Sequence, residues 1–162
     1  MKLRAVFAGS FDPVTYGHLD VIRRASRLFD HVVVACASNS DKSGLFTPEE
    51  RLDLVRSVTG DLGNVSTSTF TGLVVKWAID NNIDVMIRGL RGDHDLAYEM
   101  RIARVNSTIG PMETLFLPAD PRHTHISSSL VRDLAALNAD ISTMVPAVVA
   151  DALAQRLGGT QE

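Results

Sequence analysis

Short apolar runs rich in β-branched residues alternate along this chain with longer stretches in which apolar residues recur at helical spacing. The apolar runs predict five strands, at Leu3 to Ala8, His31 to Ser38, Val65 to Phe70, Asp84 to Ile87 and Thr114 to Leu117. The other stretches predict helices, at His18 to Phe29, from Pro48, at Leu73 to Asn81, at Leu96 to Ile109, at Ser128 to Leu137 and at Ala147 to Leu157. Such alternation is typical of βα units. We therefore predict an α/β fold, with a single doubly wound, Rossmann-like parallel sheet of five strands flanked by helices and a helical C-terminal end.

The helix from Pro48 has the clearest start signal in the sequence. The segment Thr47 to Glu50 offers an N-cap, a proline at the first helical position and a glutamate three residues after the cap. Leu52 and Val55 should then face the core. No internal repeat, low-complexity tract or linker precedes the polar tail from Gly158, so residues 1–162 are expected to form a single domain.

The composition argues against several classes of function. The single cysteine, Cys36, cannot form an internal disulfide, and its apolar neighbours favour a buried, inert thiol. The apolar run from Leu3 to Ala8 is too short for a membrane span or a signal-peptide core, so we expect a cytoplasmic protein without a membrane partner. A net charge of −3 argues against a nucleic-acid-binding surface, although local cations such as Lys42 and Arg91 still allow an anionic ligand.

The segment directly after the first predicted strand, Gly9 to His18, holds residues suited to phosphate. Gly9 permits a tight turn close to a ligand, and Ser10 can donate to a phosphate oxygen. A helix that starts near His18 would offer free amides and the positive end of its dipole. Alternatively, Ser10 and Thr15 cap turns and His18 is a polar residue at a helix start, so each residue alone leaves both interpretations open.

A second group of candidate ligands follows the fourth predicted strand. Arg88 and Arg91 should leave the sheet at its carboxyl edge, where ligands bind in such folds. Arginine presents a fork of donors that matches phosphate oxygens. The alternative is an ion-pair network of these arginines with Asp93 and Asp95. Glu99 is expected near the start of the next helix, where the helix dipole favours a carboxylate.

Three consecutive serines, Ser127 to Ser129, stand at the start of another predicted helix. Their hydroxyls and the free amides of the helix could wrap a triphosphate, or they could cap the helix. Capping alone explains one serine rather than three.

Taken together, these motifs resemble a known superfamily. Gly9 to Pro13 followed by Thr15 to His18 is similar to the signature of the nucleotidyltransferases that share a core with class I aminoacyl-tRNA synthetases. That signature carries a paired His-x-Gly-His, and a threonine at its first position resembles the branch of the phosphopantetheine adenylyltransferases. Further segments resemble this branch in the same order: Lys42, Thr47 to Arg51, Ile87 to Arg91, Tyr98 with Glu99, and Ile126 to Ser129. The resemblance spans the chain from Arg4 to about Leu157.

The resemblance implies roles for individual residues. The catalytic candidates are His18, as the main stabiliser of the transition state, with Ser10, Lys42 and Arg91. The ATP-binding candidates are Ser10, Phe11, His18, Gly89, Leu90, Arg91, Glu99 at the ribose, His123, Thr124, His125, Ile126, Ser127, Ser128 and Ser129. The acceptor-binding candidates are Ser10, Lys42, Arg88 and Val74, with Val74 along the pantetheine arm.

The sequence departs from this family's usual pattern at three positions. His123 and His125 stand where aromatic residues are frequent, and Leu96 stands where phenylalanine is usual. These changes affect the expected packing of the adenine ring rather than the expected reaction.

The reaction implied by the family is attack by the phosphate of 4′-phosphopantetheine on the α-phosphorus of ATP, which gives dephospho-coenzyme A and pyrophosphate. The nucleophile is already anionic near neutral pH, so catalysis reduces to positioning and to neutralising charge. No cluster of Asp, Glu, His or Cys has metal-site spacing, so Mg²⁺ is expected to arrive on ATP. The family also implies a homohexamer and inhibition by coenzyme A.

Alternative functions remain open from the sequence. A nicotinamide-mononucleotide adenylyltransferase or a cytidylyltransferase would use the same loop, although Arg88 to Arg91 with Tyr98 and Glu99 favours the pantetheine branch. A tRNA synthetase is disfavoured because the chain is too short for anticodon recognition and Ile126 to Ser129 lacks that class's signature lysines. A non-catalytic ATP sensor could share the fold, but the combination of His18, Lys42 and Arg91 favours turnover.

Overall fold

The computed structural model describes residues 2–38 and 44–158, apart from the side chains of residues 93 and 94. Its strands form one five-stranded sheet in the order β3-β2-β1-β4-β5, parallel at every pairing. The strands are β1 (Arg4–Gly9), β2 (His31–Ala37), β3 (Val65–Phe70), β4 (Val85–Leu90) and β5 (Glu113–Pro118). The helices are α1 (Tyr16–Leu28), α2 (Pro48–Thr59), α3 (Val74–Asp80), α4 (Asp93–Ile109), the short 3₁₀ helix η1 (Pro121–His123), α5 (Ser128–Ala136) and α6 (Ala147–Gly158). The predicted fold class is confirmed.

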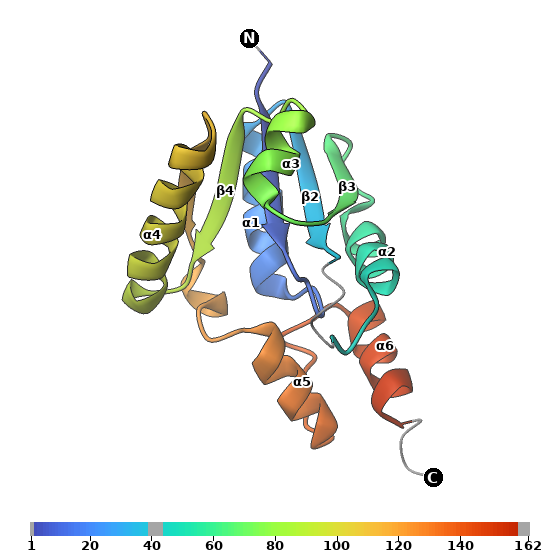
Figure 1. The fold of residues 1–162 in the computed structure, drawn as a ribbon. Helices are drawn as coiled ribbons and strands as arrows, with labels where there is room; N and C mark the ends of the chain where they lie inside the picture. Colours follow the sequence, from blue (N-terminus) through green and yellow to red (C-terminus); the bar gives the residue numbers. More distant parts are fainter. Residues whose placement is uncertain (1, 39–43, 159–162) are drawn as a thin grey trace.

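Side chains of successive strand residues alternate between two cores, one on each face of the sheet. Ala5, Phe7 and Ile87 belong to the core under α1, α2, α5 and α6. Val6 and Met86 belong to the core under α3. Figure 1 shows the resulting arrangement, with α3 in front of the sheet and α1 behind it. Because both faces are covered, the central strands read as continuous apolar runs in the sequence.

The helix α2 begins with the predicted capping box. The Thr47 hydroxyl accepts from the Glu50 N–H at 3.2 Å, and the Thr47 N–H donates to Glu50 Oε2 at 2.8 Å. Val55 is fully buried as expected, whereas Leu52 is only partly buried and Leu54 takes the inward position.

Two element boundaries differ from the prediction in ways that affect the site. β4 continues through Leu90, because the segment from Arg88 pairs in register with Phe116 to Pro118 of β5. Arg88 therefore projects from within the strand rather than from the loop after it. α4 begins at Asp93 without a side-chain cap, after Gly92, so the sequence carries no start signal there. Glu99 consequently lies in the second turn of α4 rather than near its start.

The order of the strands creates a switch point at the centre of the sheet. β1 lies between β2 and β4, so the chain continues to one side after β1 and to the other side from β4 onward. Ligands of such sheets bind outside the carboxyl ends of the strands at this point. Within the described ranges, no helix has both the length and the apolar character needed to cross a membrane.

Cys36 lies at the end of β2, fully buried, as the sequence predicts. Burial raises the pKa of its thiol to about 12, an effect that the nearby Arg51 charge partly offsets. Because the thiolate is the reactive form, this side chain is inert near neutral pH.

Candidate active site

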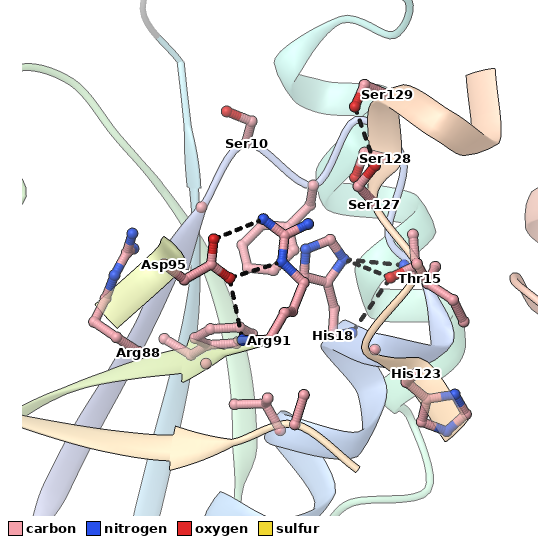
Figure 2. A pocket seen from close by; sticks show the side chains of 18 of the residues that line it. Ser10, Thr15, His18, Arg88, Arg91, Asp95, His123, Ser127, Ser128 and Ser129 are labelled. Carbon is pink, nitrogen blue, oxygen red and sulfur yellow. Dashed lines mark hydrogen bonds and ion pairs between the residues drawn. The ribbon is translucent and has the colours of Figure 1, made fainter. Parts of the chain in front are cut away.

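A cavity of about 440 Å³ opens beyond the carboxyl ends of β1 and β4, at the switch point of the sheet. Its wall combines the loop after β1, the first turn of α1, the end of β4, one face of α4 and the start of α5 (Figure 2). The candidates from the sequence that line it are Ser10, Phe11, His18, Arg88, Gly89, Arg91, Glu99, His123, Ile126, Ser127, Ser128 and Ser129. Segments far apart in the sequence are thus brought together by the fold.

His18 is held by the start of the helix that it helps to cap. Thr15 is the N-cap of α1, and its hydroxyl accepts from the His18 N–H at 3.4 Å. The Thr15 N–H in turn donates to Nδ1 of the His18 ring at 3.1 Å. Since Nδ1 accepts this bond, the proton of the neutral ring sits on Nε2. The capping box therefore fixes both the orientation and the tautomer of the ring, and Figure 2 shows the ring beside Arg91 at the cavity.

The surroundings of His18 keep its ring uncharged. Its ring lies 5.0 Å from the ring of Phe11 and 6.2 Å from that of Phe7, measured between centroids. Burial, together with the positive charge of Arg91, lowers the pKa of His18 from 6.5 to about 4. At neutral pH this residue offers a neutral N–H donor, and it is a poor proton carrier.

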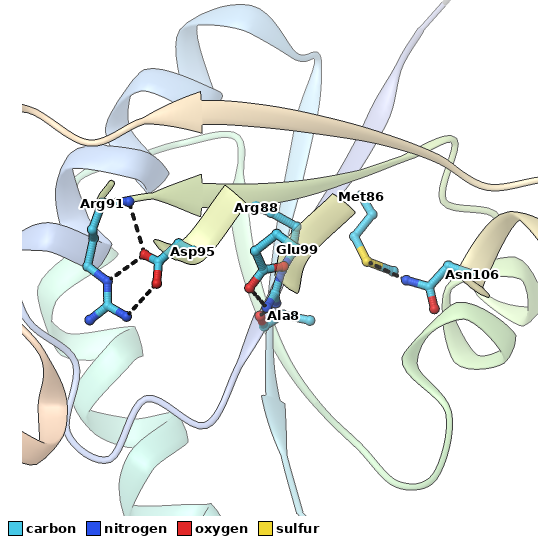
Figure 3. Close-up of polar contacts among 7 residues, drawn as sticks. All are labelled: Ala8, Met86, Arg88, Arg91, Asp95, Glu99 and Asn106. Carbon is cyan, nitrogen blue, oxygen red and sulfur yellow. Dashed lines mark hydrogen bonds and ion pairs between the residues drawn. The ribbon is translucent and has the colours of Figure 1, made fainter. Parts of the chain in front are cut away.

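Arg88 and Glu99 form a two-pronged ion pair in the cavity wall. Arg88 Nε and Nη2 each donate to one carboxylate oxygen of Glu99 at 2.7 Å (Figure 3). Arg88 Nη1 also donates to the carbonyl of Ala8 at 3.0 Å. These contacts fix the guanidinium on the α4 side of β1. The ion-pair alternative from the sequence named Asp93 and Asp95. In the structure the longer β4 directs Arg88 to Glu99 instead of Asp95, and the side chain of Asp93 lies outside the described part of the chain.

Arg91 lies just beyond the end of β4 and pairs with Asp95 in the first turn of α4. The Asp95 carboxylate accepts from the Arg91 N–H at 3.1 Å and from Nε at 3.0 Å (Figures 2 and 3). For this arginine the predicted ion pair is present. The side chain of Arg91 is still 47% exposed, so its remaining donors can reach a ligand in the cavity.

The three serines of α5 all face the cavity, and each has a different partner. Ser127 is the N-cap, since its hydroxyl accepts from the Leu130 N–H at 3.1 Å. The Ser128 hydroxyl donates to the carbonyl of Pro13 at 2.8 Å, which ties α5 to the loop after β1. The Ser129 hydroxyl lies 3.1 Å from that of Ser127. Capping thus occupies one serine, and the start of α5, where a helix offers amide donors suited to an anion, lies at the cavity wall.

Comparison with known proteins identifies the family. The model of the cytidylyltransferase-like family matches residues 6–134. A phosphopantetheine adenylyltransferase from Streptomyces coelicolor is 46% identical over 154 residues, which cover 95% of this chain and 97% of the relative. Proteins of the same name from Geobacter sulfurreducens and Leuconostoc citreum are 44% and 47% identical, over 96% and 94% of this chain and 95% and 98% of their own. The chain belongs to the phosphopantetheine adenylyltransferase family.

Members of this family are enzymes of the nucleotidyltransferase class, and this chain is one of them. The family assignment favours the pantetheine branch over the cytidylyltransferase and sensor alternatives. A solved structure assigned as a nicotinate-nucleotide adenylyltransferase from Vibrio parahaemolyticus has a TM-score of 0.67 at 23% identity, over 94% of this chain and 99% of that one. At this identity the likeness concerns the fold alone.

Several candidates carried over from the adenylyltransferase motif lie outside the cavity wall. Thr124 and His125 are exposed, and the Thr124 hydroxyl donates to the carbonyl of Pro121 at 3.1 Å. They face outward because the turn after η1 directs only residues three apart, His123 and Ile126, to the interior. The ATP-binding roles of Thr124 and His125 stay predictions.

Three further candidates are placed as follows. Leu90 is the last residue of β4, where its carbonyl accepts from the Ala119 N–H at 2.7 Å. Val74 opens α3 and packs against the core on that face of the sheet, away from the cavity wall. Lys42 lies outside the described residues.

The structure also adds residues that sequence reasoning missed. Arg132 lines the cavity, and its Nη1 donates to the carbonyl of Asp12 at 2.5 Å. A signal for it exists in the sequence, because Arg132 follows Ser128 by four residues and so shares its helix face. Asp95, which the sequence suggested only as an ion-pair partner, also lines the cavity.

Among the described residues, no group of three or more His, Cys, Asp or Glu side chains could hold a metal ion. The expectation that magnesium is carried by ATP is not tested by this observation.

Proposed function

We propose that this protein moves AMP from ATP onto the phosphate of 4′-phosphopantetheine, in the penultimate step of coenzyme A biosynthesis. The observation that carries the proposal is the gathering of a neutral His18 donor, two arginines and the start of α5 around one cavity at the switch point. This set of donors suits a triphosphate and a second phosphate side by side.

The proposed chemistry is a single displacement at the α-phosphorus. An oxygen of the acceptor phosphate forms the new bond to phosphorus, and the bond to pyrophosphate breaks with its electron pair on the leaving group. The acceptor is already an anion, so no side chain has to remove a proton. A His18 ring with a pKa of about 4 fits this requirement, since it donates a hydrogen bond without exchanging a proton near neutral pH.

We assign His18 to the oxygens of the α-phosphoryl group. Donors fixed before the reaction stabilise developing charge without reorganisation. The hydrogen bond from the Thr15 N–H supplies this fixation for the Nε2–H of His18. Arg91, Ser127, Ser128 and Ser129 would then surround the triphosphate, with Gly89 and Leu90 against the nucleotide.

We assign Ser10, Lys42 and Arg88 to the acceptor phosphate, and Val74 to the pantetheine arm. Arg88 is held by Glu99, so binding of the phosphate would meet a guanidinium already in place. Each Glu99 oxygen accepts one bond from Arg88, and the remaining lone pairs are available to ribose hydroxyls. Magnesium is proposed to enter with ATP, bound by triphosphate oxygens and water.

We further propose a homohexamer that is inhibited by coenzyme A and acts in the cytoplasm. Support for self-association comes from exposed apolar side chains on α4. These are Leu96, Tyr98, Met100, Val105 and Ile109. Contiguous exposed apolar surface marks protein interfaces.

The test of the proposed function is pyrophosphate release from MgATP with 4′-phosphopantetheine, with nicotinamide mononucleotide and with no acceptor. We expect pyrophosphate to be released only when phosphopantetheine is the acceptor. If pyrophosphate is released only with nicotinamide mononucleotide, the protein belongs to another branch of the superfamily. If ATP binds but no acceptor gives pyrophosphate release, the non-catalytic ATP sensor is favoured.

A further inference from the structure

Arg51 is a buried cation adjacent to the cavity. It lies in the first half of α2 with 7% of its surface exposed, and its Nη1 donates to the carbonyl of Ser10 at 2.7 Å. Its Nε donates to the carbonyl of Thr47 at 3.4 Å. Within residues 2–38 and 44–158, no carboxylate forms an ion pair with this guanidinium. Burying a charge without an opposite charge costs free energy. The position of the Arg51 guanidinium beside Ser10 therefore suggests a function.

The loop that carries Ser10 is fastened independently at a second point. The Asp12 carboxylate accepts from the N–H groups of Leu45 and Phe46, each at 2.9 Å. The carbonyl of Asp12 accepts from Arg132 of α5. These contacts hold the loop at Asp12, whereas Arg51 holds the carbonyl of Ser10. Loss of Arg51 should therefore release Ser10 without releasing the whole loop.

We propose that Arg51 is a positioning residue for the acceptor phosphate. By binding the carbonyl of Ser10, it fixes the exposed Ser10 hydroxyl at the cavity, and its buried charge raises the positive potential there. Arg51 itself does not line the cavity and acts through Ser10. The inference rests on the proposed function, because it takes Ser10 as a ligand of the acceptor.

The effect of Arg51 should be specific to one substrate. The proposed function assigns ATP to His18 on α1, to the segment from Gly89 to Arg91, and to the serines Ser127 to Ser129. The side-chain hydrogen bonds of Arg51 go to Thr47 and Ser10 and to none of these residues. A shift of about 1 Å in a positioned group can cost about a hundredfold in rate. The acceptor step should thus weaken while ATP binding persists.

The experiment compares Arg51→Met and Arg51→Lys with the wild type, by steady-state kinetics in both substrates and by calorimetric Kd for ATP. We expect kcat/KM for phosphopantetheine to fall about 10-fold to 100-fold in Arg51→Met. Arg51→Lys, which keeps the charge and one donor, should lie in between, and the ATP Kd should stay within about threefold in both. Arg56→Met is the matched control, since Arg56 lies on the same helix with 62% of its side chain exposed, and its kinetics should match the wild type.

Several results would overturn the proposal. These are an unchanged kcat/KM for phosphopantetheine in a folded Arg51→Met protein, an equal loss of ATP affinity, or no rescue by lysine. If Arg51→Met does not fold, the test rests on Arg51→Lys. A raised KM for phosphopantetheine at an unchanged Kd for ATP then supports the proposal, and an unchanged KM overturns it. Wild-type protein that fails to transfer AMP to phosphopantetheine would instead refute the proposed function, and this inference with it.

Discussion

At the scale of residues, His18 shows how one hydrogen bond and burial set the chemistry of a side chain. An isolated histidine has a pKa close to neutrality and two interchangeable tautomers. The Thr15 N–H selects one tautomer, and burial together with the charge of Arg91 disfavours the charged form of the ring. A residue that usually shuttles protons is converted into a fixed donor, as a reaction with an anionic nucleophile requires.

Replacement of His18 by alanine should therefore affect turnover far more than binding. We expect kcat to fall about a hundredfold or more, since a donor that acts mainly in the transition state contributes about 3 to 4 kcal/mol. Steady-state kinetics and a calorimetric Kd for ATP measure the two effects separately. His31→Gln is the control, because His31 lies at the opposite, amino end of β2 and contacts Ser66. Unchanged turnover in His18→Ala would remove this residue from the mechanism.

The protonation of His18 can be measured directly by NMR titration of its ring. We expect a pKa of about 4 in the folded protein, against 6.5 in the unfolded chain. Between these values the unfolded chain takes up a proton that the folded protein does not. This residue should thus lower the free energy of unfolding as the pH falls from 6.5 towards 4. A folded-state pKa near 6.5 would show that the ring is solvated and free to carry charge.

At the scale of elements, the close packing of β4 on α1 sets the floor of the cavity. Gly89 lies in β4 on the α1 face, and a Cβ added there would come 3.1 Å from Cγ2 of Val21. This contact is tighter than ordinary van der Waals packing. A side chain at this position therefore requires Val21 to move by a few tenths of an ångström at the point where the cavity opens.

Gly89→Val should consequently destabilise the fold. Overpacking of this kind costs about 1 to 3 kcal/mol, which urea unfolding can measure. Gly63→Ala is the control, because a Cβ at Gly63 meets no described atom within 4 Å. Equal free energies of unfolding for Gly89→Val and the wild type would mean that Val21 moves aside freely.

Elements were predictable from the sequence where their own signals are strong. The five strands and the capped helix α2 follow from apolar runs and from Thr47 to Glu50. The end of β4 was not predictable, because the charged Arg88 and the flexible Gly89 interrupt the apolar run, and the segment up to Leu90 becomes strand by pairing with β5. The start of α4 has no cap, and the tight turn of η1 rests on a local Asp120 contact with the Arg122 N–H.

The candidate site was also only partly predictable from the sequence. The loop after β1, the arginines and the serines carried recognisable motifs, and these residues do meet at one cavity. The partnership of Arg88 with Glu99 depended on where β4 ends and α4 begins, which only the tertiary structure determines. Arg51 was visible in the sequence as part of a motif, but its contact with Ser10 joins residues 41 positions apart.

At the scale of the whole molecule, the fold keeps a cavity lined by arginines apart from the exposed apolar side chains of α4. Arg88, Arg91 and Arg132 gather at the switch point although the chain carries a net charge of −3. Tyr98, Val105 and Ile109 share an exposed stripe of α4 at spacings of seven and four residues. We expect this stripe to be covered in the assembled enzyme.

Charges placed on that stripe should disrupt assembly. Val105→Glu with Ile109→Glu puts two carboxylates at the expected interface, where uncompensated charge is unfavourable. Sedimentation velocity should then show smaller species than the wild type. Leu28→Glu, at an exposed apolar position on α1, should leave the sedimentation unchanged. A double variant that sediments like the wild type would place the interface elsewhere.

The central claim is direct transfer of AMP from ATP to 4′-phosphopantetheine, and the most direct test follows the transferred group. Wild-type protein is incubated with ATP radiolabelled at the α-phosphate, with Mg²⁺ and with phosphopantetheine, and the products are separated. The account predicts that the label appears in dephospho-coenzyme A and that pyrophosphate stays unlabelled. Label that appears as free AMP, or that remains in ATP while ATP binding is measurable, would contradict it.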